Sequence, residues 1–247
     1  MVHLNMGKGF TCKQFVIEHD HCAMKVNTDS FVLGSWADAP QGGRALDIGC
    51  GSGILSLMLR QRMGPGSRVD ALDINEGAVH QTRCNAAASP WPDDIAVTQT
   101  DVRLFETSCL YDVVVCNPPY FTHGQVGRHA HLAQSQARQQ ARQQDSLTAQ
   151  QLFGSSAPLL RESGTLCCLY PTSMAERVIH DARQCGLYLQ RQLVVFPTPD
   201  KPSHVTAFCF ARQQKNHVTK TELVIRDAQN SYSDNYRELC RSFYLAF

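Results

Sequence analysis

The chain has 247 residues, of which 43% are hydrophobic and 18% are charged, and its formal net charge is +1. This length suits one α/β domain with a full core and would be cramped for two domains. The sequence has no apolar run near the roughly 20 residues of a membrane helix and no signal-peptide hydrophobic region, so we expect a cytoplasmic protein that has no membrane partner.

The cysteines predict a reduced protein without a disulfide framework. The eleven cysteines include no Cys-x-x-Cys pair. Cys116, Cys167, Cys168 and Cys209 lie in apolar runs, as buried thiols do. The sequence His19-Asp20-His21-Cys22 has metal-binding residue types. Neighbouring residues of an extended chain point to opposite faces, however, so these side chains do not converge easily and we predict no metal site.

The N-terminal segment comprises residues 1–43 and includes a helix that begins near Thr28. Thr28 is an acceptable N-cap, and Asp29 would then be an acid in the first turn, where the helix dipole favours it. A second interpretation is that Thr28 and Asp29 fold over a ligand of the following segment, and the two interpretations are compatible. Phe10 and Phe15 are expected to pack in a core.

A glycine loop begins the domain that we assign to residues 44–247. Residues 44–48 are predicted as a strand and residues 53–63 as a helix, with glycine at 49, 51 and 53 between them. The glycines allow a ligand to approach the backbone closely. The pattern Asp-x-Gly-x-Gly-x-Gly from Asp47 differs from the dinucleotide pattern Gly-x-Gly-x-x-Gly. An acid at the strand end suits a cationic or amino-acid-bearing ligand.

Two further acids end the next predicted strands. Strand 68–72 is followed by Asp73, helix 75–88 comes next, and strand 95–100 is followed by Asp101. A doubly wound fold places a carboxylate such as Asp73 beside ribose hydroxyls, and Asp101 would face the base end of the same ligand. Each acid alone is also compatible with a solvated loop residue.

The most specific motif follows the predicted strand 111–116. It reads Asn117-Pro118-Pro119-Tyr120. The prolines fix φ and lack N–H groups, so the backbone becomes rigid and presents carbonyl acceptors. The Asn117 side chain adds an acceptor and Tyr120 adds a flat ring, so the motif can hold a planar amino group while the ring stacks on a base. An ordinary Asn-Pro turn is the alternative.

The rest of the chain completes an alternating pattern. The predicted elements are helix 147–161, strand 164–170, helix 172–186, strands 187–196 and 204–212, strand 222–226 and helix 233–243. This alternation predicts a mostly parallel, seven-stranded, Rossmann-like sheet with helices on both faces. Residues 197–202 are too few for a crossover helix, so we expect a C-terminal antiparallel hairpin.

The stretch after the Asn-Pro-Pro-Tyr motif is basic. It contains no acid between Asp112 and Asp145, while Arg128, Arg138 and Arg142 supply positive charge. A solvated face is one explanation. Because the stretch directly follows the motif, we favour a wall over the substrate that contacts phosphates.

Taken together, these segments resemble the bacterial tRNA1(Val) adenine-37 N6-methyltransferase family, within the class I S-adenosylmethionine-dependent methyltransferases. The resemblance spans nearly the whole chain and rests on five segments: 10–15, 22–29, 46–53, 117–121 and a tail from Leu223 to Leu245. The first and last are much more specific than the glycine loop. Departures are small: Cys50 stands where a small residue such as alanine is expected, and Asp73 stands where glutamate is common.

The resemblance implies a reaction and the residues that perform it. S-adenosylmethionine would donate a methyl group to the exocyclic N6 of an adenine in the tRNA anticodon region, namely A37 of tRNA1(Val). The expected partner is the anticodon stem-loop of tRNA, with no DNA and no obligate protein partner. Cofactor contacts are expected from Thr28, Asp47, Gly49, Gly51, Gly53, Asp73, Asp101 and Asn117. The catalytic residues would be Asn117, Pro118, Pro119 and Tyr120, and RNA contacts are expected from Lys25, Phe121, Arg128, Arg138 and Arg142.

Several alternatives stay open at this point. The Asn-Pro-Pro-Tyr motif also occurs in enzymes that methylate DNA adenine or release-factor glutamine. The chain has no room for the recognition domain of the DNA enzymes, and its N-terminal segment is short for a release-factor enzyme. Methylation of another RNA is a further alternative. A non-catalytic RNA-binding module would predict a broken loop or a lost acceptor, and the glycine spacing disfavours a nicotinamide oxidoreductase.

Overall fold

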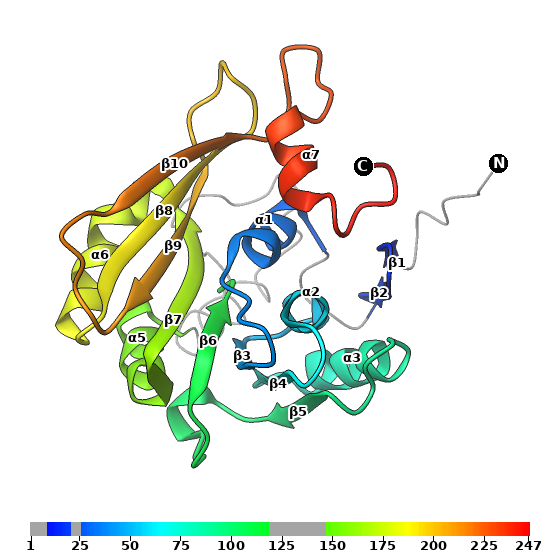
Figure 1. Cartoon of the computed structure of the whole chain (residues 1–247), viewed down its shortest axis with the longest axis vertical. Coiled ribbons are helices and arrows are strands. Elements are labelled where there is room, and N and C mark those ends of the chain that lie inside the picture. The colour runs from blue at the N-terminus through cyan, green and yellow to red at the C-terminus, as the bar shows by residue number, and fades with distance from the viewer. Residues whose placement is uncertain (1–8, 21–25, 119–146) are drawn as a thin grey trace, which may run out of the picture.

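The computed structural model describes residues 9–20, 26–118 and 147–247, and within them the chain forms one large sheet covered by helices (Figure 1). The strands of the large sheet are β3 (Arg44–Ile48), β4 (Arg68–Asp73), β5 (Ile95–Gln99), β6 (Tyr111–Cys116), β7 (Leu160–Pro171), β8 (Tyr188–Phe196), β9 (Val205–Ala211) and β10 (Thr219–Val224). The helices are α1 (Thr28–Trp36), α2 (Ile54–Met63), α3 (Glu76–Ala87), α5 (Ala149–Ser156), α6 (Ala175–Gln184) and α7 (Asp234–Cys240).

The sheet has the strand order β10-β8-β9-β7-β6-β3-β4-β5. Strand β9 is antiparallel to both β7 and β8, and the remaining pairs are parallel. The Rossmann-like fold class and the antiparallel C-terminal hairpin are therefore confirmed. The predicted count of seven strands is wrong, because β10 adds an eighth strand in parallel to β8 at the sheet edge. The chain leaves β3 toward β4 and returns to β6 on the other side, which makes the β3–β6 boundary a topological switch point.

Successive residues of the central strands pack into two separate cores. In β6, Val113 and Val115 join one core, while Val114 and Cys116 join the other. The first core packs against α1 and α2, and the second against α5 and α6 (Figure 1). This two-residue alternation is the geometry of a strand that is buried on both faces. Ten cysteines are described, all as free thiols, and most are buried as predicted.

Local chemistry explains where several helices begin and end. Helix α1 begins at Thr28 as predicted, but the prediction that Thr28 is its cap is wrong, because Asn27 accepts the Ser30 N–H. Asparagine is a stronger N-cap than threonine, since its short carbonyl reaches that N–H readily. Helix α5 is shorter than the predicted helix 147–161, because a 3-10 turn that contains Pro158 follows it and β7 already starts at Leu160.

The N-terminal residues form a small hairpin that the sequence did not predict. Strands β1 (Gly9–Thr11) and β2 (Val16–Glu18) pair antiparallel. Phe15 is buried and Phe10 packs on Phe31 at a ring distance of 4.8 Å, so both aromatic residues lie in a core as expected. Among the described helices, none combines the length and the apolar character required to span a bilayer.

Candidate active site

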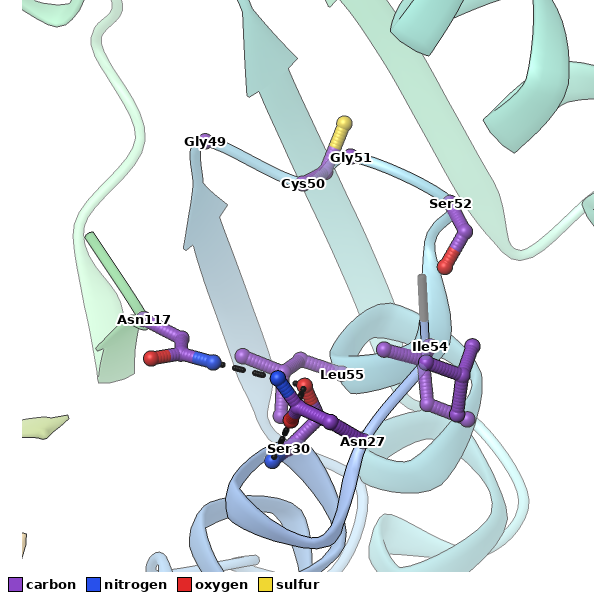
Figure 2. Close-up of a pocket in the computed structure, with 10 residues that line it drawn as sticks. Asn27, Ser30, Gly49, Cys50, Gly51, Ser52, Ile54, Leu55 and Asn117 are labelled. Atoms are coloured by element: carbon purple, nitrogen blue, oxygen red, sulfur yellow. Dashed lines mark hydrogen bonds between the residues drawn. The ribbon is translucent and has the colours of Figure 1, made fainter. Parts of the chain in front are cut away.

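The glycine loop and Asn117 follow directly after two neighbouring strands, at the same edge of the sheet. In the parallel pair of β3 and β6, Ile48 lies opposite Cys116, so Gly49 and Asn117 are the next residues of each strand. Both line one cavity of about 400 Å³ that is open to solvent (Figure 2). The cavity is lined by Val26, Asn27, Ser30, Gly49, Cys50, Gly51, Ser52, Ile54, Leu55 and Asn117.

The glycine loop leaves space that a side chain would fill. Gly49, Gly51 and Gly53 have φ values of 73°, 56° and 79°, in the left-handed region that favours glycine. A Cβ added to Gly49 or Gly51 would meet nothing within 4 Å, whereas one on Gly53 would lie 2.8 Å from Thr82 Cγ2. The first two glycines therefore form an open cradle for a ligand, and the third allows α3 to pack closely.

Residues outside the cavity hold this loop in place. Asp73 Oδ2 accepts a hydrogen bond from Gly51 N at 3.0 Å, and Thr82 Oγ1 donates to Gly51 O at 2.8 Å. Asp73 is thus placed beside the loop and fixes the loop's conformation directly, while its predicted contact with ribose hydroxyls stays a prediction. Cys50 of the loop is buried, and this burial together with the charge of Asp47 raises the pKa of its thiol. The thiol form of Cys50 therefore persists at neutral pH.

Asp47 is a fully buried carboxyl group at the end of β3. Its Oδ2 accepts from Ser56 Oγ at 2.6 Å, while its Oδ1 has no hydrogen-bond partner in the part of the chain that the structure describes. Burial raises the pKa of Asp47 to about 7, against the opposing effect of the Ser56 hydrogen bond. Asp47 does not line the cavity, but a buried anion with an unpaired oxygen stabilises a cation bound nearby.

The sequence missed Ser30, which contacts Asn117, and Asn27, which contacts Ser30. Asn117 Nδ2 donates to Ser30 Oγ at 3.3 Å, and Ser30 Oγ donates to Asn27 Oδ1 at 3.2 Å (Figure 2). Both residues line the cavity, whereas the neighbouring Thr28, which the sequence favoured, is not among its lining residues. The Asn-Thr-Asp-Ser run at the start of α1 was the available signal, because it places short polar side chains on one helical turn.

The remaining predicted site residues are distributed as follows. Pro118 is buried directly after β6. Asp101 lies after β5 and is ion-paired with Arg103, which lowers its pKa, so its carboxylate already has a counter-charge. Outside the described residues lie Lys25, Pro119, Tyr120, Phe121, Arg128, Arg138 and Arg142.

One group of metal-ligating residue types exists among the described residues, apart from the cavity. Ligand atoms of Asp38, Cys167 and Cys209 lie within 4.8 Å of one another. Arg191 forms an ion pair with Asp38 at 2.6 Å. A guanidinium group at this position already balances the carboxylate charge and repels a metal cation.

Comparisons with known proteins identify the family. A family profile described as "Methyltransferase small domain" matches residues 21–147. A Pectobacterium carotovorum protein named tRNA1(Val) (adenine(37)-N6)-methyltransferase is 41% identical over 96% of this chain and 94% of its own. The chain belongs to the tRNA1(Val) (adenine(37)-N6)-methyltransferase family. A Bacteroides thetaiotaomicron protein of the same name is 39% identical over 96% of this chain and 97% of its own.

The fold agrees with this family. The crystal structure of a predicted O-methyltransferase from Agrobacterium tumefaciens has a TM-score of 0.62 at 16% identity, covering 87% of this chain and 96% of that chain. The family resemblance and S-adenosylmethionine as the cofactor, both predicted from the sequence, are confirmed. The observed site fits this cofactor in two respects. The cradle at Gly49 and Gly51 leaves the backbone open to a ligand, and the buried Asp47 carboxyl, with one unpaired oxygen, lies two residues before the first of these glycines.

Proposed function

We propose that this protein transfers a methyl group from S-adenosylmethionine to N6 of A37 in tRNA1(Val). The single observation that carries the proposal is that Asn117 and the glycine loop line one cavity at the switch point between β3 and β6. The names of the full-length relatives support the choice of nucleoside and tRNA. A cytoplasmic location is part of the proposal, because tRNA is present there.

The cofactor would be held by the glycine loop and by the start of α1. When bound, S-adenosylmethionine supplies an electrophilic methyl group on a positively charged sulfur. The backbone of Gly49 and Gly51 admits a ligand at close range, and Asp73 keeps that backbone fixed. Asp47 provides negative charge behind the loop. Thr28 and Asp101 remain proposed cofactor contacts, with Asn27 added because it lines the cavity.

Asn117 and Pro118 would activate the substrate amino group. The lone pair of an adenine amino group is delocalised into the ring, so the nitrogen is a poor nucleophile. Two acceptors, the Asn117 side-chain oxygen and the Pro118 carbonyl, would hold the amino hydrogens and favour a pyramidal nitrogen. Because this geometry develops in the transition state, the interaction increases turnover. The amino proton leaves to solvent after the nitrogen–carbon bond has formed.

The anticodon stem-loop would approach the cavity with A37 rotated out of its stack. Rotation of a loop base costs a few kcal/mol, and stacking on an aromatic ring returns about 1–3 kcal/mol. Tyr120 is the proposed stacking residue. The basic residues Lys25, Arg128, Arg138 and Arg142, with Phe121, are proposed to contact the RNA, and phosphate contacts predict salt-dependent binding.

Purified protein, labelled S-adenosylmethionine and an unmodified tRNA1(Val) transcript test the proposal. We expect N6-methyladenosine at position 37 by nucleoside mass spectrometry, and none from a transcript with guanosine at that position. Asn117→Ala should reduce kcat by about 100-fold or more, as the loss of one transition-state contact does. Methylation of another RNA or of a release factor in place of tRNA1(Val) would reassign the substrate. Cofactor binding without methyl transfer to any of these would instead support a binding module.

A further inference from the structure

We infer that Ser30 is a positioning residue that determines which side-chain atom of Asn117 faces the substrate. The inference rests on the proposed function, in which the Asn117 oxygen accepts a hydrogen bond from an amino group. The oxygen and nitrogen of an asparagine amide have nearly the same size, so packing alone does not choose between its two orientations. The hydrogen bonds around Ser30 make that choice.

The hydrogen bonds that link Asn27, Ser30 and Asn117 begin at the N-terminus of α1. The backbone N–H of Ser30 lies 3.0 Å from Asn27 Oδ1. A backbone N–H can only donate, so the Asn27 atom that it contacts is the carbonyl oxygen. The helix cap thereby fixes the orientation of the Asn27 amide, and Asn27 presents an acceptor to its surroundings.

Ser30 transmits this orientation to Asn117. The Ser30 hydroxyl has a single hydrogen, which it donates to the same Asn27 oxygen at 3.2 Å. Its Oγ is then available only as an acceptor, so the Asn117 atom at 3.3 Å is the amide nitrogen. The amide oxygen of Asn117 points away from Ser30 (Figure 2).

Reversal of the Asn117 amide would cost the Ser30 hydroxyl one of its two hydrogen bonds. With the Asn117 oxygen toward Ser30, the single hydroxyl hydrogen would have to choose between Asn117 and Asn27. The observed arrangement satisfies both neighbours, and Ser30 is 8% exposed, so water replaces the lost bond poorly. The reversed amide would also place its NH₂ group against the substrate amino group, so that two hydrogen-bond donors would face each other. Ser30 therefore selects the orientation that can accept.

Neutron diffraction from crystals of the perdeuterated protein tests this orientation without any substrate. Two deuterons on the Asn117 atom that faces Ser30, and one Ser30 deuteron directed at Asn27, support the inference. An oxygen of Asn117 facing Ser30 overturns it. This measurement decides the orientation even if the protein does not methylate tRNA1(Val). Failure of the inference and failure of the proposed function can therefore be distinguished.

Kinetics test the consequence of the orientation. Ser30→Ala is expected to decrease kcat about tenfold, as the loss of one hydrogen bond does, while the calorimetric Kd for S-adenosylmethionine changes less than about twofold. Cysteine has nearly the same size as serine, so Ser30→Cys serves as a second variant and should show the same decrease in kcat. Ser30→Thr keeps the hydroxyl group and should recover most of the kcat that Ser30→Ala loses. An unchanged kcat in folded Ser30→Ala and Ser30→Cys overturns the inference.

A double-mutant cycle and a matched control distinguish positioning from general support of the helix. In the Asn117→Ala background, Ser30→Ala should cause no further loss of kcat, and independent losses that multiply would overturn the inference. Ser35 is the control, since it lies in the same helix, is also 8% exposed and donates its hydroxyl to Cys240 Sγ at 3.6 Å. Ser35→Ala is expected to keep the wild-type kcat.

Discussion

Asn85 of α3 is paired through its side chain with the backbone of Glu18 in the N-terminal hairpin. Its Nδ2 donates to Glu18 O at 2.8 Å, and its Oδ1 accepts from Glu18 N at 3.1 Å. The same Nδ2 also donates to Ser52 O at 2.8 Å, in the glycine loop. One buried amide therefore joins the hairpin to the cofactor cradle, although Asn85 lies 67 residues after Glu18 in the sequence.

Asn85→Ala is expected to weaken both stability and cofactor affinity. It removes three hydrogen bonds from a mostly buried site, for which we expect a loss of about 1–3 kcal/mol in the free energy of unfolding. Because Ser52 lines the cavity, the Kd for S-adenosylmethionine should also increase, which titration calorimetry measures. Ser89→Ala is the control, since Ser89 Oγ donates to Ala86 O and accepts from Trp91 N, and neither partner lines the cavity. A comparable change of Kd in both variants would contradict the coupling.

Gly51→Ala and Gly66→Ala form a matched pair that separates backbone strain from ligand space. Both glycines have positive φ values, 56° and 79°, and a Cβ at either would meet nothing within 4 Å. Each alanine should destabilise the fold by roughly 1–2 kcal/mol through left-handed strain. Only Gly51 lines the cavity. We therefore expect the Kd for S-adenosylmethionine to increase about 10–100-fold in Gly51→Ala alone, as for an overpacked contact.

The elements that carry the site were predictable from the sequence, because their signals are local. The strands Arg44–Ile48 and Tyr111–Cys116 were predicted with the observed bounds, since each is a largely apolar segment that ends just before a glycine or an Asn-Pro turn. The glycine loop and Asn117 follow them directly. In a parallel sheet the carboxyl ends of neighbouring strands share one edge, so their meeting also followed from the sequence.

The missed features depend on packing between distant segments. The contact of Ser30 with Asn117 joins residues 87 apart, and it exists because α1 packs beside the sheet edge. The pairing of β10 with β8 likewise depends on which sheet edge is open, and nothing in Thr219–Val224 specifies that edge. The three-residue strands of the N-terminal hairpin are too short to show a period.

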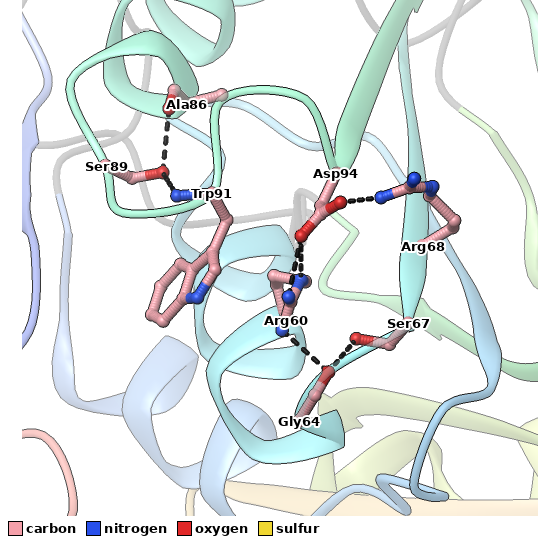
Figure 3. Close-up of polar contacts among 8 residues, drawn as sticks. All are labelled: Arg60, Gly64, Ser67, Arg68, Ala86, Ser89, Trp91 and Asp94. Atoms are coloured by element: carbon pink, nitrogen blue, oxygen red, sulfur yellow. Dashed lines mark hydrogen bonds and ion pairs between the residues drawn. The ribbon is translucent and has the colours of Figure 1, made fainter.

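Asp94→Ala is expected to destabilise the fold strongly, because it leaves a buried cation without its partner. Asp94 Oδ2 accepts from Arg60 Nη2 at 2.6 Å and Nε at 2.8 Å, and its Oδ1 is paired with Arg68 (Figure 3). The Arg60 side chain is only 7% exposed, and burial lowers its pKa. Removal of one partner of such a pair costs about 3–5 kcal/mol.

Urea denaturation of the Asp94→Ala variant measures this loss. Asp93→Ala removes the same charge from the adjacent exposed position, so its free energy of unfolding should stay within about 0.5 kcal/mol of wild type. Equal losses of unfolding free energy in the two variants would show that the change in net charge, and not the loss of pairing with Arg60, is responsible.

Asp47 should make the stability of the cofactor-free protein depend on pH. In the unfolded chain a carboxyl group of this type has a pKa near 4, whereas burial raises that of Asp47 in the folded protein to about 7. The folded state thus holds an extra proton between these values. The associated stability is fully present below pH 4 and is lost as the pH increases to about 7, by roughly 2–4 kcal/mol. Asp47→Asn should lack this decrease in urea denaturation.

The affinity for S-adenosylmethionine should also depend on the ionisation of Asp47. It should increase over the pH range in which the stability of the cofactor-free protein decreases. Above pH 7 Asp47 is an anion, and a ligand with a positively charged sulfur and amino group binds more tightly beside an anion than beside a neutral carboxyl. The affinity for S-adenosylmethionine is therefore expected to increase between about pH 6 and 8 in the wild type, with proton release on binding. Asp47→Asn should give a weaker and flat profile in calorimetry. A wild-type affinity that stays constant over this range would mean that Asp47 does not sense the cofactor's charge.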